Sequence, residues 1–273
     1  MRKSADDFRA FRRIIKSNYR LRGRDLPWRR TKNPYRILVS EMMLQQTQVE
    51  RVTGYYASFL KQFPDIYVLA HAPLRDVLTA WQGLGYNRRA LFLKKLAVEI
   101  IGKHHGILPR DPDILAALPG IDPATAAAIA AFAFNTATPF IETNVRRVYI
   151  HFFFPKKKRV SDEEIMVLVD ATLDRKNPRE WYYALMAYGA MLGRQEKENP
   201  NRRSRHYTRQ SRFEGSDRQV RAQIVRLFLT DKELTADEVA KRLKEPDRRI
   251  KTILAALQKE KFIKKSQSGF NIN

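Results

Sequence analysis

LPGIDPATA, residues 118–126, is the part of this 273-residue sequence that says most about its architecture. A short helical pattern, residues 113–117, leads into it, and an alanine-rich helical pattern runs from residue 123 to residue 134. The Pro-Gly pair interrupts a helix, whereas Pro123 suits the first position of a new one. The segment therefore predicts two helices joined by a tight hairpin.

The start of the second helix is a candidate site for a phosphate group. Its first amide groups lack partners inside the helix and carry the positive end of the helix dipole. We therefore predict contacts with DNA at Gly120, Asp122 and Thr125. An ordinary helical hairpin with an acidic N-cap explains the same residues equally well, because so short a motif is weak evidence alone.

The charge balance of the chain points to a polyanion as partner. Lys and Arg number 52 against 29 Asp and Glu, a formal net charge of +23. A domain that only has to stay dispersed needs far less. The rival partner, an acidic membrane surface, is disfavoured because no apolar run is long enough to span a bilayer and no lipidation motif is present.

Cysteine is absent from the sequence. This excludes disulfides, a thiolate nucleophile, and zinc or iron–sulfur sites with cysteine ligands. No metal site is expected. The first residues lack the apolar region of a secretory signal, so the expected location is the cytoplasm.

Glu41 is a candidate general acid. The helix that follows Asn33-Pro34 has an apolar side that includes Ile37 and Leu44, and Glu41 lies on or beside it. A carboxyl group held against apolar side chains has a raised pKa and can keep its proton near neutral pH. The alternative is an ordinary ion pair, for which Arg29 is the obvious partner.

Two polar segments have the composition of DNA contacts. Residues 44–48 place uncharged amides, among them Gln45 and Gln46, directly after the acid, where they can hydrogen-bond base edges or simply face water. Residues 82–89 combine two glycines with Tyr86, Arg88 and Arg89. This tip offers a ring for stacking and cations for phosphate.

Apolar residues recur at helical spacing as far as Leu192, which predicts an all-α fold. From residue 193 to 215 this pattern stops and arginines crowd the sequence, as in an arm that becomes ordered on a polyanion. The last part predicts three helices and two short strands, typical of a winged helix that binds DNA or another protein. We expect domains at residues 1–195 and 216–273, joined by a basic linker, 196–215.

Several of these motifs, taken in order, resemble the helix-hairpin-helix DNA glycosylases and, among them, the MutY-type adenine glycosylases. The similarity runs from about Leu26 to about Leu192. The segments that carry it are Leu26–Arg29, Asn33–Tyr35, Val39–Val49, Gly83–Tyr86, the hairpin, and Asn144–Val148. The resemblance implies two helical lobes with a cleft between them, into which a nucleotide is flipped from the duplex.

The resemblance also implies roles for single residues. Glu41 matches the acid that protonates a purine leaving group, and Glu142 matches the carboxylate that stabilises the cationic sugar, with Asn144 as polar support. Ala124 stands where related bifunctional enzymes carry a lysine, so strand cleavage through a Schiff base is not expected. The contacts with DNA predicted outside the hairpin are Arg29 near the flipped base, Gln46 and Tyr86 as wedges, and Gln45, Arg88 and Arg146.

The sequence departs from the family pattern in four places. Glu142 replaces the usual aspartate, which moves the carboxylate by one methylene, and Asp122 replaces the second glycine of the hairpin. An acid there is unfavourable near phosphate unless it caps the next helix. No cysteine follows Leu192, so the family's iron–sulfur cluster is expected to be missing and no cofactor is expected. The predicted winged helix replaces the family's C-terminal domain that reads oxidised guanine.

The resulting hypothesis is a monofunctional DNA glycosylase that removes a mispaired or damaged base, with adenine opposite oxidised guanine as first choice. One alternative keeps the fold and changes the base to thymine or uracil in G mismatches, or to a deaminated purine. The other is a DNA-binding module with a degenerate site. The expected partner is double-stranded DNA with a mismatch or lesion, bound by a monomer in the nucleoid of the cytoplasm.

Overall fold

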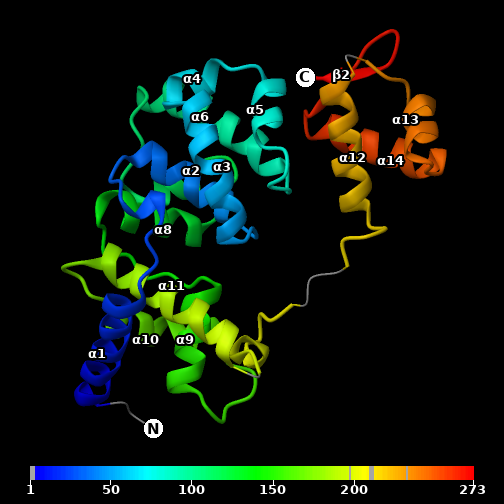
Figure 1. The fold of residues 1–273 in the computed structure, drawn as a ribbon. Coiled ribbons are helices and arrows are strands. Elements are labelled where there is room, and N and C mark those ends of the chain that lie inside the picture. Colours follow the sequence, from blue (N-terminus) through cyan, green and yellow to red (C-terminus); the bar gives the residue numbers. More distant parts are fainter. Residues whose placement is uncertain (1–3, 197, 209–211, 232) are drawn as a thin grey trace. The chain divides into compact units, whose positions relative to one another are not determined.

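The computed structural model describes residues 4–196, 198–208, 212–231 and 233–273. The protein is mostly helical, with one small antiparallel pair of strands in the described residues, which confirms the predicted all-α fold with a small C-terminal sheet (Figure 1). The chain divides into two compact units. The first unit contains Met1–Glu41 and Pro109–Arg209, and the second contains Met42–Leu108 and Gln210–Asn273.

The first unit holds both candidate acids. Its elements are α1 (Ala5–Arg22), the 3-10 turn η1 (Pro27–Arg29), most of α2 (Pro34–Leu44), α7 (Pro112–Ala116), α8 (Pro123–Phe134), α9 (Thr143–Phe153), α10 (Asp162–Thr172), α11 (Pro178–Gln195) and the 3-10 turn η2 (Pro200–Arg203).

The second unit contains the predicted tip and the C-terminal part. Its elements are α3 (Val49–Gln62), α4 (Ile66–His71), α5 (Leu74–Ala80), α6 (Arg88–His104), α12 (Asp217–Thr230), α13 (Ala236–Leu243), α14 (Asp247–Lys259), β1 (Ile263–Lys265) and β2 (Phe270–Ile272). The three helices and the hairpin predicted after residue 216 are present, with Ile263 paired to Ile272. The predicted domain boundaries stay a prediction.

The helical hairpin has the predicted form. Pro123 is the first residue of α8, and Asn135 ends the helix in the left-handed region at φ 58°. All side chains from Ala126 to Ala133 are buried. A helix that is apolar on every side must be enclosed by protein, and its alanines let neighbouring backbone approach closely.

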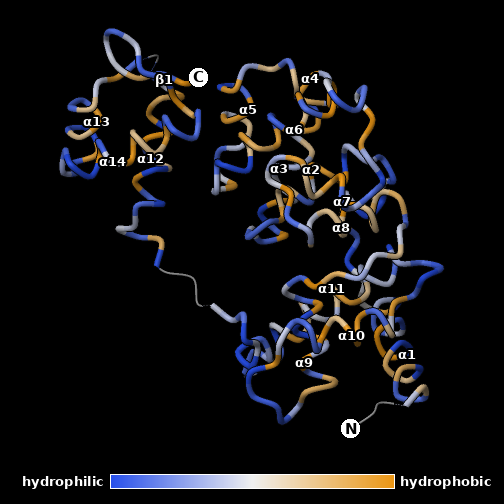
Figure 2. The backbone as a smooth tube through the Cα atoms, turned by 180° about the vertical axis from the view of Figure 1, so that it is seen from behind, coloured by the Kyte–Doolittle hydropathy of each residue, from blue (hydrophilic) through white to orange (hydrophobic). Residues whose placement is uncertain are grey.

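An aromatic cluster forms the core around α1, α9 and α11. The Phe11 ring lies 5.4 Å from that of Tyr149 and 5.8 Å from that of Trp181, centroid to centroid. The first pair is tilted and the second edge-on, and aromatic contacts of these kinds stabilise a core beyond the area that they bury. Along α1 the hydropathy alternates, as expected for a helix with one buried face (Figure 2).

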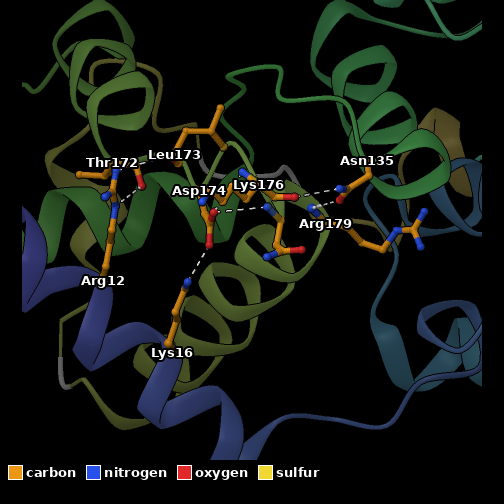
Figure 3. Close-up of polar contacts among 9 residues, drawn as sticks. Arg12, Lys16, Asn135, Thr172, Leu173, Asp174, Lys176 and Arg179 are labelled. Atoms are coloured by element: carbon orange, nitrogen blue, oxygen red, sulfur yellow. Dashed lines mark hydrogen bonds and ion pairs between the residues drawn. The ribbon is translucent and has the colours of Figure 1, made fainter.

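The loop between α10 and α11 is held from two sides (Figure 3). From α1, Arg12 Nε donates to the carbonyl of Thr172 at 2.9 Å, and Lys16 pairs with Asp174 at 2.6 Å. From the end of α8, the Asn135 amide donates to the carbonyl of Lys176 at 3.2 Å. These contacts fix the entry into α11, which carries side chains of the candidate site.

The arginine-rich stretch predicted as a linker is partly folded onto the first unit. The Val160 amide donates to the Arg203 carbonyl at 2.7 Å, and the Arg205 amide donates to the Val160 carbonyl at 2.9 Å. Asn201 and Ser204 are 5% and 8% exposed. Residues 198–206 are therefore ordered by contacts with protein, which a search for apolar periodicity does not detect because those contacts are polar.

Among the described residues, no helix combines the length and the apolar character needed to cross a bilayer.

Candidate active site

Glu41 lies in α2 beside fully buried neighbours. Ser40 and Met42 are 1% and 0% exposed, as the apolar pattern of this helix predicted. In the described part of the chain no hydrogen bond or ion pair reaches the Glu41 carboxyl. Burial raises the pKa of Glu41 to about 8; the negative charge of Glu142 adds to the rise, and Arg29 opposes it. This carboxyl therefore keeps its proton at neutral pH.

Glu142 is the N-cap of α9. Its carboxylate accepts hydrogen bonds from the amides of Asn144 and Val145, both at 2.8 Å, and from the side-chain Nδ2 of Asn144 at 3.3 Å. Burial raises the pKa of Glu142, while these amides and the charges of Arg147 and Arg146 lower it. The amides of a helix N-terminus favour an anion.

The two acids form one electrostatic pair inside the first unit, because the charge of Glu142 acts on the pKa of Glu41. Glu142 has hydrogen-bond donors that stabilise its anion, and Glu41 has none among the described residues. Glu142 therefore loses its proton first as the pH rises. Within the pair Glu41 therefore holds its proton longer and Glu142 carries the negative charge first, the division of roles that two-carboxylate hydrolysis of a glycosidic bond requires.

Arg29 lies near this pair without an ion pair to Glu41 in the described residues. Its guanidinium carbon lies 4.8 Å from the centre of the Tyr183 ring and 5.8 Å from that of Tyr19. Its Nη1 donates to the Arg24 carbonyl at 3.1 Å. The simple ion pair considered from the sequence is therefore wrong, and the positive charge lowers the pKa of Glu41 only at a distance.

Sequence reasoning missed Tyr183, which belongs to the same site. The residue lies in α11, is 6% exposed and stacks on Phe132 with the ring centres 4.6 Å apart. Burial and the charge of Glu41 raise the pKa of its phenol. Its ring packs on the Arg29 guanidinium, so Tyr183 and Arg29 lie together beside the acid. In the sequence, the helical spacing of Tyr183 indicated only a residue of the core.

Arg147, and not its neighbour Arg146, is hydrogen-bonded to Asn144, which in turn donates to Glu142. Arg147 Nη1 donates to Asn144 Oδ1 at 2.8 Å and to the Gly189 carbonyl at 2.6 Å. Arg146 instead pairs with Asp162, with Nε and Nη2 at 2.8 Å and 2.6 Å from the carboxylate. The predicted contact of Arg146 with DNA stays a prediction. The sequence did contain a signal for this contact, because Asn144 and Arg147 are three residues apart and therefore lie on the same face of α9.

Gly189 sets the distance between α11 and α9. A Cβ atom at this position would collide with the backbone carbonyl of Asn144. We expect Gly189→Ala to destabilise the protein by about 1–3 kcal/mol, since backbone has to move. The control is Gly102→Ala, because nothing lies within 4 Å of an added Cβ there. Alanine in that helix should stabilise by up to about 1 kcal/mol. Urea unfolding measures both, and equal shifts would contradict the close contact.

The hairpin carries its predicted residues at the start of α8. Gly120 has φ 78°, which favours glycine. Asp122 caps the helix: its carboxylate accepts the Thr125 amide at 2.7 Å. An acid in this hairpin was expected to be tolerated only if it caps the next helix, and Asp122 does so. The contacts with DNA predicted at Gly120, Asp122 and Thr125 stay predictions.

The remaining predicted contacts lie in the second unit. Gln46 and Tyr86, the two predicted wedges, have positive φ values of 53° and 49°. Left-handed backbone at residues other than glycine is often found at functional sites. Tyr86 accepts a hydrogen bond on its hydroxyl from Arg218 at 3.1 Å, and Arg88 Nε donates to Glu260 at 3.0 Å. Gln45 precedes Gln46 and is partly buried.

Arg89 corrects one expectation for the tip. It is 6% exposed, and its guanidinium donates to the carbonyls of Met42 and Met43 at 2.8 Å and 2.6 Å. It also donates to Thr47 Oγ1 at 2.8 Å. Arg89 therefore ties the end of α2 to the tip and is not a phosphate-binding cation, which sequence composition could not distinguish.

Known proteins share both the sequence and the fold. Residues 39–171 match the HhH-GPD superfamily of base excision DNA repair proteins. Over 236 residues the chain is 34% identical to an adenine DNA glycosylase of Mycobacterium tuberculosis, covering 76% of this chain and 74% of that protein. The chain belongs to the adenine DNA glycosylases of the HhH-GPD superfamily.

Other relatives of the adenine DNA glycosylase family cover less. The protein from Mycolicibacterium smegmatis is 47% identical over 126 residues, 46% of this chain and 43% of its own length. The protein from Buchnera aphidicola subsp. Baizongia pistaciae is 37% identical over 171 residues, 61% of this chain and 48% of its own length. The chain thus spans about half the length of these two relatives.

The fold of the family is also found in a solved thermostable thymine-DNA glycosylase. It superimposes with a TM-score of 0.63 over 71% of this chain and 91% of that protein, at 24% sequence identity. This likeness supports the architecture alone.

The residues of this chain do not fit the iron–sulfur cluster that is found in the family it resembles. The sequence has no cysteine to supply thiolate ligands. The described residues hold no group of three or more His, Asp or Glu side chains at metal-binding distances. In the stretch where the cluster loop was expected, residues 198–206 pack through hydrogen bonds.

Proposed function

We propose that the protein is a monofunctional DNA glycosylase that removes mispaired adenine from duplex DNA in base excision repair. The observation that carries this proposal is the pair of acids in the first unit. One carboxyl is desolvated and lacks donors in the described residues, and the other is held as an anion by the start of α9.

In this reaction Glu41 donates its proton to the adenine ring as the bond between the base and the sugar breaks. A pKa of about 8 suits a general acid, because the group is protonated at neutral pH and still gives up its proton readily. Adenine then leaves as a neutral base and not as an anion.

Glu142 stabilises the positive charge that develops on the sugar. Its charge is fixed in place before the reaction by the amides of α9 and by Asn144, so no reorganisation is required. Water adds to the sugar carbon, its proton passes to Glu142, and the products are free adenine and an abasic site. The excess of basic residues supports binding to duplex DNA.

Base release from a panel of duplexes tests the proposal. The duplexes carry adenine opposite guanine, oxidised guanine or cytosine, thymine or uracil opposite guanine, and a deaminated purine. Mass spectrometry identifies the released base, and alkali reveals abasic sites. We expect adenine from mispairs and none from A·T pairs. Release of thymine or uracil alone would overturn the choice of base, and no release from any duplex would overturn the enzymatic assignment.

We expect no strand cleavage without alkali. Ala124 offers no amine at the position where related bifunctional enzymes carry lysine, so a Schiff base with the sugar cannot form there. Borohydride should therefore trap no covalent complex between protein and DNA. A trapped complex would show that another amine acts as nucleophile.

The remaining parts of the proposal concern the state of the enzyme. We propose that it works without an iron–sulfur cluster, because no cysteine is available to bind one. We further propose that it acts as a monomer on double-stranded DNA with a mismatch or lesion, in the nucleoid of the cytoplasm. Binding should weaken steeply with salt, since contacts with phosphate release counterions.

A further inference from the structure

The packed segment from Glu198 to His206 holds the beginning of α9. Asn201 Nδ2 donates to the carbonyl of Thr143, the residue directly after Glu142, at 3.0 Å. The Asn201 Oδ1 atom is buried and has no hydrogen-bond partner in the described residues. A buried acceptor without a partner lowers the stability of the fold. The hydrogen bond from Asn201 to Thr143 is therefore kept although burial of the Asn201 side chain has this cost.

Asn199 links this segment to the side chains around Glu142. Its Oδ1 accepts from the Asn201 amide at 3.1 Å, which caps η2, and from Arg147 Nε, also at 3.1 Å. The three neutral acceptors of the Arg147 guanidinium are thus Asn199, Asn144 and the Gly189 carbonyl. Together they fix the plane of the guanidinium.

The orientation of Asn144 follows from that of Arg147. An arginine side chain only donates hydrogen bonds, so the Asn144 amide must turn its oxygen toward Arg147. Its nitrogen then points the other way, toward Glu142 Oε2, at 3.3 Å. A reversed amide would place two donors against each other at Arg147 and an oxygen against the carboxylate.

We propose that Asn199 is a positioning residue for the Glu142 carboxylate and acts through Arg147 and Asn144. The inference rests on the proposed function, in which Glu142 is the catalytic anion. It assigns a role to the segment that stands where the resemblance implies a cluster, for which this chain has no cysteine ligands.

The charged groups that face Glu142 are Glu41 from α2 and Arg146 and Arg147 from α9. Of these, only Arg147 depends on Asn199. Loss of Asn199 removes one of the three acceptors that fix the Arg147 guanidinium, so the guanidinium and the Asn144 amide are held less firmly. The Glu142 anion then loses support, its pKa rises, and its carboxylate is held less firmly against the reacting sugar.

The test uses Asn199→Ser, because serine still caps η2 but is too short to reach Arg147. Asn199→Asp keeps the acceptor and serves as the rescue. The matched control is Asn135→Gly, which also removes a loop-bridging asparagine of the first unit (Figure 3) and keeps the left-handed backbone. Asn135 has no contact with Arg147, Asn144 or Glu142 in the described residues.

Two readouts are measured on the full chain. In protein with ¹³C-labelled glutamate, an NMR titration gives the pKa of Glu142, assigned with Glu142→Gln. We expect Asn199→Ser to raise this pKa by about one unit. In single-turnover excision we expect the rate to fall about 10-fold or more, with the acidic limb of the pH profile moved to higher pH and the affinity for DNA unchanged. Asn199→Asp should restore most of the rate.

An unchanged pKa and an unchanged acidic limb in Asn199→Ser would overturn the inference, as would equal changes in Asn135→Gly. The titration does not depend on activity. If the unaltered protein releases no base from any duplex, the proposed function fails, while the titration still decides whether Asn199 positions Glu142.

Discussion

Replacing Glu41 by glutamine is expected to lower the rate of adenine release by about 10²–10⁴-fold, the contribution of a general acid. Glutamine has nearly the same shape and is neutral, as the protonated acid is at pH 7, so the fold and the affinity for DNA should be kept. Single-turnover excision with enzyme in excess gives the rate, and a binding titration gives the affinity. An unchanged rate of adenine release would remove Glu41 from the catalytic machinery and show that the base leaves without protonation by this residue.

The pH profile provides a second check on Glu41. Its pKa is about 8, so the excision rate should fall above pH 8 in the unaltered protein as the proton donor is lost. This alkaline limb should be absent from the residual activity of Glu41→Gln. On the acidic side the rate should fall as Glu142 takes up a proton, in both proteins.

The free energy of unfolding should also depend on pH because of the raised pKa of Glu41. The pKa of Glu41 is raised from 4.5 to about 8 on folding, so between these values the folded state binds more protons than the unfolded state. The contribution of Glu41 to stability is therefore present in full below pH 4.5 and is lost as the pH rises to about 8. Relative to the unaltered protein, Glu41→Gln should gain up to about 1.4 kcal/mol per pH unit within this window. Urea unfolding at pH 5 and pH 8 measures the difference.

The sequence reveals those features of the site that depend on local order along the chain. Glu41 stands between apolar helix positions, and its desolvation follows from their spacing. The hairpin follows from Pro119, Gly120 and Pro123, and the cap at Asp122 follows from the proline after it. Such features are determined within one or two helical turns.

The features that the sequence does not reveal depend on how distant elements pack. Whether Arg146 or Arg147 bonds to Asn144 is decided by the rotation of α9 against α11, and the close approach at Gly189 sets this rotation. Arg88 and Arg89 are adjacent arginines that the sequence cannot tell apart. Arg89 is buried because the carbonyls at the end of α2 accept its hydrogen bonds. The contact of Asn199 with Arg147 spans 52 positions of sequence, and no periodicity reports it.

Replacing Glu142 by glutamine is expected to lower the excision rate by about 10³-fold, a loss of the size seen when a fixed electrostatic contact to a transition state is removed. The amide oxygen can still accept from Asn144 and Val145, so the cap on α9 persists and stability should change by no more than about 1 kcal/mol. The acidic limb of the pH profile should disappear. A rate equal to that of the unaltered protein would show that no anion is required at this position.

Replacing Glu142 by aspartate separates the charge from the length of the side chain. The carboxylate is held by the Asn144 and Val145 amides at the start of α9, both at 2.8 Å, and aspartate is a preferred N-cap that can accept the same amides. We therefore expect Glu142→Asp to keep the excision rate within about 10-fold, whereas a carboxylate misplaced by about 1 Å would cost about 10²-fold. A loss of that larger size would mean that the site is built around the longer side chain, and that Asn144, Arg147 and the segment behind them have moved with it.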